Sequence, residues 1–177
     1  MIIQDNDKLI LITNDDGLYA AGLKTLTGIM KEFGKVVVIS ATESRSAMSQ
    51  ALTVKQPLRV KLLEETDDLR MYACSGTPTD GVKLAINQLL ERKPDLLVSG
   101  INHGSNASAS VLYSGTMAAA LEGCLYGITS AGFSLNSYSP TADFSVCEKY
   151  IRTICKTVLS EPLPQGVCLN VNLPAIE

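Results

Sequence analysis

The sequence contains 177 residues, of which 46% are hydrophobic and 19% charged, a composition typical of a globular protein with a single domain at residues 1–177. A formal net charge of −3 argues against the broad basic surface that binding a nucleic-acid polymer requires. The chain shows neither a signal segment nor an apolar run as long as a membrane span, so no membrane association is expected. The five cysteines are scattered without a zinc-site spacing, which favours reduced thiols in a cytoplasmic protein.

The first predicted element is a strand at residues 8–13, and two adjacent carboxylates follow it directly. Its short run of branched apolar residues is typical of a strand that is covered on both faces. Asp15 and Asp16 can converge on one point only where the backbone has left the strand, and Gly17 permits such a turn. The pair indicates a site for a hard cation, while the alternative is ordinary turn and helix-capping chemistry.

The remaining predicted elements alternate between helix and strand. In chain order they are a helix at 20–33, a strand at 35–40, a polar loop at 41–53, an edge hairpin at 54–63 with Asp67 and Asp68 near its tip, a strand at 71–74, a capped helix at 77–92, a strand at 95–99, a helix at 117–125, a strand at 128–135, a helix at 143–159 and a strand at 166–171. This alternation predicts an α/β fold: a three-layer, Rossmann-like, mainly parallel sheet with helices on both faces.

Polar residues follow two further strands, and the topology predicts that they meet the acidic pair at the carboxyl ends of the strands. Ser46 lies in the loop after the second strand, although it is one of several hydroxyls there. Asn102 follows the strand at 95–99, although it could simply hold a left-handed turn. We expect His103 to be a surface residue or a substrate contact rather than an acid or base. Arg45 is equally well interpreted as a phosphate contact or a solvated charge.

A candidate anion site precedes the helix at 117–125. Ser114, Gly115 and Thr116 there offer backbone N–H groups at the positive end of the helix dipole, although a plain helix cap is the competing interpretation. Ser105 and Asn106 could add hydrogen bonds to phosphate oxygens.

The candidate ligands form an all-oxygen set. Two carboxylates, a hydroxyl and an amide oxygen suit Mg²⁺ or Mn²⁺ better than zinc, which would favour His or Cys. These residues indicate metal-assisted hydrolysis of a phosphomonoester, with an Asp carboxylate that orients or deprotonates a water. The sequence has no Gly-x-Ser-x-Gly elbow, no Walker A run and no Gly-x-Gly-x-x-Gly after the first strand, which disfavours the corresponding enzyme classes.

Five motifs occur along the chain: Asn14-Asp15-Asp16-Gly17, Ser44-Arg45-Ser46-Ala47-Met48-Ser49, Ser75-Gly76-Thr77-Pro78-Thr79-Asp80, Ser99-Gly100-Ile101-Asn102 and Tyr113-Ser114-Gly115-Thr116. In this order and approximate spacing they resemble the SurE family of stationary-phase survival proteins, over about residues 9–174. The resemblance implies a Rossmann-like sheet, divalent-metal dependence and hydrolysis of nucleoside 5′-monophosphates. It also implies hydrolysis of 3′-monophosphates in many members and of short polyphosphate in some.

Residue by residue, the resemblance implies that Asp15, Asp16, Ser46 and Asn102 hold one Mg²⁺ or Mn²⁺ per subunit and that the two Asp are catalytic. The resemblance also implies that four further residues lie around the phosphate: Asn106, Ser114, Gly115 and Thr116.

The chain departs from the family in one minor place, residues 20–22, which are Ala-Ala-Gly where the family often has Ala-Pro-Gly, and in two larger ones. The family often has Leu-Gly-Asp after Asn106, whereas residues 107–110 are Ala-Ser-Ala-Ser, so the preferred base or sugar stays open. Family members generally continue past residues 170–174 into a portion with an extended hairpin and subunit-exchanging elements. We therefore expect a domain that lacks this extension, and a homodimer or homotetramer only where the extension is present. A non-catalytic nucleotide- or phosphate-binding module with the same fold remains the alternative to an enzyme.

Overall fold

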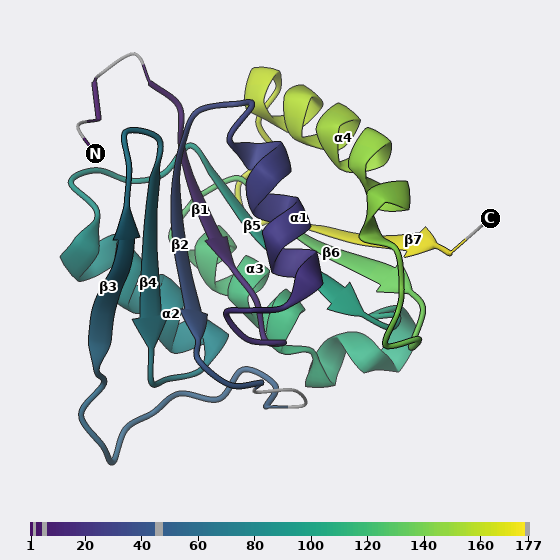
Figure 1. The fold of residues 1–177 in the computed structure, drawn as a ribbon, viewed down its shortest axis with the longest axis horizontal. Coiled ribbons are helices and arrows are strands. Elements are labelled where there is room, and N and C mark those ends of the chain that lie inside the picture. Colours follow the sequence, from purple (N-terminus) through teal and green to yellow (C-terminus); the bar gives the residue numbers. More distant parts are fainter. Residues whose placement is uncertain (2, 5–6, 45–47, 176–177) are drawn as a thin grey trace.

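The computed structural model describes residues 1, 3–4, 7–44 and 48–175, and its central feature is one twisted sheet (Figure 1). Its strands follow the order β3-β4-β2-β1-β5-β6-β7. All neighbouring strands are parallel except β3 and β4, which pair antiparallel. The strands are β1 (Leu9–Thr13), β2 (Lys35–Ala41), β3 (Val60–Glu65), β4 (Leu69–Cys74), β5 (Leu96–His103), β6 (Ser130–Asn136) and β7 (Leu169–Pro174). The predicted mainly parallel α/β architecture is confirmed.

Helices cover both faces of this sheet, and the alternation of side chains along β1 shows why. Ile10 and Ile12 belong to the core beneath α1 (Ala21–Met30) and α4 (Glu148–Ser160). Leu9 and Leu11 point the other way, into the core beneath α2 (Pro78–Leu84) and α3 (Gly115–Leu125). In Figure 1, α1 and α4 lie in front of the sheet, and α2 and α3 lie behind it. Fully burying each such side chain contributes about 1.5–3 kcal/mol, so β1 is a central stabilising element.

Several predicted boundaries shift in the structure. The edge hairpin at 54–63 is wrong in its bounds, because β3 begins at Val60 and turns back to β4 after residue 65; the predicted position of Asp67 and Asp68 at the tip is correct. The strand predicted at 95–99 continues to His103, because β5 resumes its pairing with β6 after an irregularity between Ser99 and Asn102.

Element ends also differ at three helices and at the last strand. The helix that follows Thr77 ends as a π-helical turn, η1 (Ala85–Leu89), short of residue 92. The helix predicted at 117–125 begins at Gly115, so Gly115 and Thr116 lie in its first turn after a short 3₁₀ helix, η2 (Ser108–Tyr113). The helix predicted at 143–159 opens with the 3₁₀ helix η3 (Phe144–Cys147), and β7 lies three residues later than expected.

The strand order defines the position of a ligand site. From β1 the chain passes through α1 to β2 on one side, and from β4 it returns through α2 to β5 on the other side of β1. In open parallel sheets ligands bind outside the carboxyl ends of the strands at this switch point. The carboxyl ends of β1 and β5 are therefore where a site is expected. No helix in the described part of the chain is both long enough and apolar enough to span a bilayer.

Candidate active site

The turn after β1 is fixed by Asn14. Its Nδ2 donates to the carbonyl oxygen of Gly17 (2.9 Å), and its Oδ1 accepts from the hydroxyl of Ser40 at the end of β2. Gly17 has φ +98°, a conformation that glycine adopts without strain. The side chain of Asn14 thus ties two strand ends together and turns Asp15 and Asp16 out of the sheet.

Asp15 is buried against the start of α3. The hydroxyl of Thr116 donates to its Oδ1 (2.6 Å). A Cβ built on Gly115 would lie 2.8 Å from the Cβ of Asp15, so only glycine lets the helix approach this closely. Ser114 caps α3 by accepting from the backbone N–H of Met117 (3.0 Å). Two of the three residues predicted as an anion site, Gly115 and Thr116, therefore lie directly against the first carboxylate, and the third caps the same helix.

Asp16 is partly exposed and faces the end of β5. The backbone N–H of His103 donates to its Oδ2 (3.3 Å), which joins the acidic turn to the segment that carries Asn102. The ring of His103 packs edge-to-face on Phe144, with ring centroids 4.8 Å apart. His103 thus contributes its backbone to the site, while its side chain is held by packing.

Asn102 presents its side-chain oxygen as a free acceptor. Its Nδ2 donates to two carbonyl oxygens, those of His103 and Gly104, both at 2.9 Å. Carbonyls can only accept, so this orientation of the amide is fixed. In the described part of the chain Oδ1 has no donor, which suits an oxygen ligand.

Burial dominates the electrostatics of the acidic pair. Desolvation raises the pKa of Asp15, although the hydrogen bond from Thr116 lowers it in part, and the adjacent charge of Asp16 raises it further. Desolvation also raises the pKa of Asp16, against a smaller lowering by the backbone hydrogen bond from His103. Neither carboxylate forms an ion pair with any described residue.

These observations test whether a metal ion fits. Two desolvated carboxylates without a cation, beside a free amide oxygen, match the oxygen ligands of Mg²⁺ or Mn²⁺. Among the described residues, His, Cys, Asp and Glu side chains form no cluster of three, so a site here must include amide or hydroxyl oxygen. The donor set therefore fits a hard divalent cation.

The loop after β2 runs from the acidic turn towards α3. The hydroxyl of Ser44 donates to the backbone oxygen of Asp15 (3.4 Å), and further along the loop the hydroxyl of Ser49 donates to the carbonyl of Leu112 (2.6 Å) in η2. Arg45 and Ser46 lie outside the described residues, so their predicted roles stay predictions. The flanking contacts nevertheless anchor this loop at both sides of the site.

Ser105 and Asn106 are held by the last two strands. Oδ1 of Asn172 in β7 accepts from the backbone N–H of Asn106 (2.7 Å) and from the hydroxyl of Ser105 (3.2 Å). The amide Nδ2 of Asn106 donates to Ser134 (2.9 Å), the register partner of Asn102 in β6. Among the described residues, the second amide proton of Asn106 has no acceptor. These hydrogen bonds place the two residues beside β6 and β7, on the far side of β5 from β1.

Sequence reasoning missed the positioning residues. From sequence Asn14 has no predicted role beyond its motif, and Asn172 has none beyond its place in the segment at residues 170–174. The available signals were an asparagine directly after β1 and the two asparagines that alternate with apolar residues in β7, because amide side chains there can hydrogen-bond to neighbouring loops.

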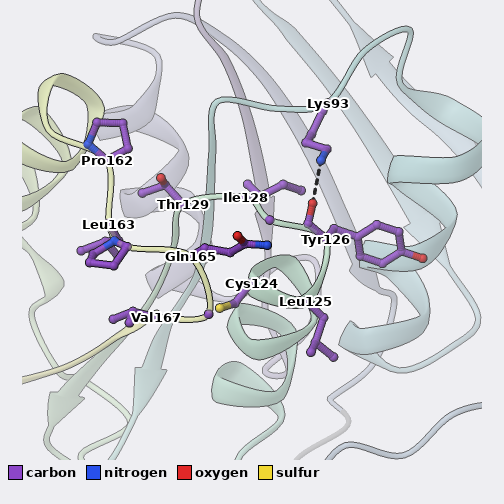
Figure 2. A pocket seen from close by; sticks show the side chains of 13 residues that line it. Lys93, Cys124, Leu125, Tyr126, Ile128, Thr129, Pro162, Leu163, Gln165 and Val167 are labelled. Carbon is purple, nitrogen blue, oxygen red and sulfur yellow. Dashed lines mark hydrogen bonds between the residues drawn. The ribbon is translucent and has the colours of Figure 1, made fainter.

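A separate cavity of about 470 Å³ lies at the opposite edge of the sheet (Figure 2). It is lined by the segments that precede β6 and β7, and by Lys93, which donates to the carbonyl of Tyr126 (2.7 Å). None of the candidate site residues lines it. Because it lies at the amino ends of the strands, it does not compete with the acidic turn as the ligand site of this sheet.

Comparisons with known proteins agree with this arrangement. The family model described as "Survival protein SurE" matches residues 10–177. A protein of Bacteroides fragilis named 5′-nucleotidase SurE is 48% identical over 172 residues, which are 97% of this chain and 68% of that protein. A protein of Christiangramia forsetii with the same name is 50% identical, over 96% of this chain and 66% of that protein. The crystal structure of the SurE protein from Aquifex aeolicus superposes with a TM-score of 0.85 at 36% identity, over 96% of this chain and 67% of that one. The chain thus spans about two thirds of the length of these relatives.

Proposed function

Because this chain belongs to the SurE family, we propose that it is a metal-dependent phosphomonoesterase that hydrolyses nucleoside 5′-monophosphates to nucleoside and phosphate. The observation that carries the proposal is the pair of desolvated carboxylates, Asp15 and Asp16, which lacks a cation partner among the described residues. A binding module that only holds nucleotides has less support, since the relatives from Bacteroides fragilis and Christiangramia forsetii are named as nucleotidases. Nucleoside 3′-monophosphates and short polyphosphate are further candidate substrates.

Asp15, Asp16 and Asn102, together with Ser46, would hold one Mg²⁺ or Mn²⁺ per subunit. When bound, such an ion supplies positive charge that stabilises the phosphoryl group in the transition state and acidifies water. Asn14 holds the turn that carries both carboxylates, and Thr116 holds Asp15 at the start of α3. The less buried Asp16 is the better placed of the two to orient the attacking water.

The phosphate would lie between the carboxylates and the start of α3. Ser114 and Gly115 are positioned there at the positive end of the helix dipole. Ser105 and Asn106 would complete the phosphate contacts from the side of β6, where Ser134 fixes the amide of Asn106. Because the sheet shields this side of the site from water, the hydrogen bonds to the phosphate would be stronger than in solution.

We also propose a cellular compartment and an assembly state for the enzyme. All five cysteines are free thiols, which supports the reducing cytoplasm. A single domain at residues 1–177 that assembles as a homodimer or homotetramer in the presence of a C-terminal extension is consistent with relatives that are longer than this chain.

Phosphate release from adenosine 5′-monophosphate tests the proposal. We expect release with Mn²⁺ or Mg²⁺ that stops when EDTA is added. Asp16→Asn should lower the rate by about 100-fold or more, as expected when a group that stabilises transition-state charge is removed. Asp67→Asn, at the exposed tip of the β3–β4 hairpin, is the matched control and should behave as the unmodified chain. Nucleotide binding without release at any metal concentration would contradict the proposal.

A further inference from the structure

Tyr138 carries a large aromatic ring that is mostly solvent-exposed yet lies on the backbone of the candidate site. The residue is 81% exposed. A Cβ built on Gly104 would lie 2.2 Å from Cε1 and 2.5 Å from Cζ of the ring, so the ring covers the Cα of Gly104. A ring in this position adds little to the core, and most of its surface stays available for a ligand.

The loop that carries Tyr138 is fixed to the end of β5. The backbone N–H of Gly104 donates to the carbonyls of Leu135 (2.9 Å) and Ser137 (3.0 Å). The hydroxyl of Ser139 accepts from the backbone N–H of Thr141 (3.3 Å), which holds the loop in one turn. Beyond the loop, the ring of Phe144 packs on His103. The platform is therefore built before any ligand binds.

Two hydrogen bonds connect this platform to the proposed metal ligands. Asn102 donates to the carbonyl of Gly104, the residue beneath the ring, and the neighbouring His103 donates to Asp16. Asp15, by contrast, faces the start of α3 through Thr116. Gly104 is followed directly by Ser105 and Asn106, so Tyr138 lies beside the proposed phosphate contacts on the β6 side of the carboxylate pair.

We propose that the ring of Tyr138 stacks on the base of the nucleotide substrate and so selects nucleotides over simple sugar phosphates. The inference rests on the proposed function, because it requires that the phosphate bind at the carboxylates. Stacking on an aromatic face accepts every base, and its strength grows with the area in contact. The platform therefore favours purine over pyrimidine nucleotides, and both over a phosphate ester that has no base.

Kinetics with three substrates test the platform: adenosine 5′-monophosphate, cytidine 5′-monophosphate and ribose 5-phosphate, with Mn²⁺. Tyr138→Ala should raise KM for the adenine nucleotide by about tenfold, in line with the loss of one base–aromatic stack. KM for ribose 5-phosphate should change by less than about twofold, because no base is present to lose its partner. The preference for adenine over cytosine should shrink in parallel.

Three further variants separate stacking from other roles. Tyr138→Phe should keep the original KM because it retains the ring face, and Tyr138→Leu should behave like Tyr138→Ala. Tyr150→Ala, an exposed tyrosine on α4 (47% exposed), is the matched control and should leave all three KM values unchanged. If Tyr138→Ala raised KM for adenosine monophosphate and for ribose 5-phosphate by the same factor, the inference would be overturned. The inference would also be overturned if Tyr138→Ala left KM unchanged while Tyr19→Ala or Tyr113→Ala raised KM for the adenine nucleotide alone. Tyr19 and Tyr113 are the other exposed tyrosines near the site.

Binding measurements distinguish failure of the platform from failure of the proposed function. If the chain released phosphate from none of these substrates, the proposed function would be wrong. Calorimetric titration with Mn²⁺ present would then still compare adenosine monophosphate with ribose 5-phosphate. A selective weakening of adenosine monophosphate in Tyr138→Ala would support the platform, and an equal weakening of both ligands would overturn it.

Discussion

Asp15 and Asp16 are the residues at which the fold holds negative charge away from water. Desolvation raises the pKa of both, and the hydrogen bonds from Thr116 and from the backbone of His103 offset only part of this. A folded metal-free chain must therefore carry two carboxylates in a place that disfavours their charge. Function and stability are in conflict at this turn.

This conflict predicts that Asp16→Asn stabilises the metal-free chain although it removes activity. The amide oxygen of Asn can still accept from the backbone N–H of His103, while the disfavoured charge is gone. We expect a higher Tm for the variant in EDTA, measured by thermal denaturation. Mn²⁺ should raise the Tm of the unmodified chain and leave that of the variant unchanged, since only the former has the full ligand set. A lower Tm in EDTA would show that the charge of Asp16 is stabilised.

The same residue predicts a pH dependence with a defined sign. A carboxyl whose pKa is raised by folding binds protons more tightly in the folded state, so its ionisation destabilises the fold as pH rises from 3.8 through the raised pKa. The difference in metal-free Tm between Asp16→Asn and the unmodified chain should thus be largest at neutral pH. It should shrink as pH falls through the raised pKa towards 3.8, in a series of melts with EDTA. A difference that grew on acidification would contradict the assigned direction.

Single residues with strong local chemistry were predictable from sequence, but their partners were not. The adjacent Asp15 and Asp16 after an apolar strand indicated a site without any structure. The hydrogen bond from Thr116 to Asp15 joins residues 101 positions apart, and no local pattern reveals such a pairing. The sequence predicts Thr116 as a phosphate contact, and this stays a prediction; what the structure shows is that its hydroxyl holds a carboxylate.

At the scale of elements, the approach of α3 to the acidic turn is set by one residue without a side chain. A methyl group at Gly115 would meet the Cβ and carboxylate of Asp15 at under 3 Å, and the Cβ cannot move without the backbone. Gly115→Ala should therefore displace the start of α3 and lower nucleotidase activity by about 10- to 100-fold, as small misplacements of reacting groups do.

The control for this prediction is Gly28→Ala in α1. A Cβ on Gly28 meets no atom within 4 Å, so alanine should gain about 0.5–1 kcal/mol of stability from helix propensity. Its activity should be unchanged. Urea denaturation and phosphate release measured on both variants check the pair, and a fully active Gly115→Ala would show that α3 can shift without disturbing the site.

The start of α2 shows what a buried cap contributes. The carboxylate of Asp80 accepts from the backbone N–H groups of Thr77 (2.9 Å) and Thr53 (3.1 Å). In return, the hydroxyl of Thr77 accepts from the backbone N–H of Asp80. Asp80→Ala should lower the free energy of unfolding by about 2 kcal/mol, because a buried donor and a half-buried donor lose their acceptor. Asp143→Ala, which removes an exposed cap from η3, should cost less than about 1 kcal/mol.

Asp80 also has a pH dependence opposite to that of Asp16. Desolvation raises the pKa of Asp80, but hydrogen bonds from Thr53 and Thr77 outweigh this and bring the pKa below its usual 3.8. The stabilisation is therefore complete above pH 3.8 and is lost as pH falls through the lowered pKa. Denaturation of Asp80→Asn at neutral and acid pH checks this, and a difference that did not narrow in acid would contradict it.

The periodicity of apolar residues predicted most helices and strands correctly. It gave wrong ends for those elements in which tertiary contacts or strand pairing override the local residue preferences. Gly100 reads as the end of a strand, yet β5 continues to His103 because it resumes its pairing with β6. This extension places Asn102, a predicted metal ligand, within the strand itself. The start of α3 was set too late for the opposite reason, since Gly115 and Thr116 are poor helix formers that tertiary contacts hold in the first turn.

For the whole molecule, the alternation of helices and strands predicted a shared edge at which the strand-end residues meet, and the structure brings Asp15, Asp16, Asn102 and the start of α3 to that edge. The strand order could not be derived, because several doubly wound orders satisfy the same pattern. The order matters, since it places β7, the last strand in the chain, beside β6 and within reach of the loop at residues 105–106.

This placement predicts that a residue in the last strand controls the proposed phosphate site. Asn172 accepts from the backbone N–H of the buried Asn106 and from the hydroxyl of Ser105. Asn172→Ala would leave the N–H of Asn106 without a partner, which should cost about 1–3 kcal/mol of stability. The loop should loosen and KM for nucleotides should rise, because a misplaced Asn106 no longer meets the phosphate.

The matched control is Asn87→Ala, which removes an exposed amide that donates to Lys83 and Tyr126, remote from β7. Its KM should be unchanged. Thermal melts and steady-state kinetics on both variants separate a general loss of stability from a loss of positioning. If Asn172→Ala were destabilised but kept its KM at temperatures well below its Tm, the loop would hold its geometry without β7. The phosphate contacts assigned to Ser105 and Asn106 would then not depend on the last strand.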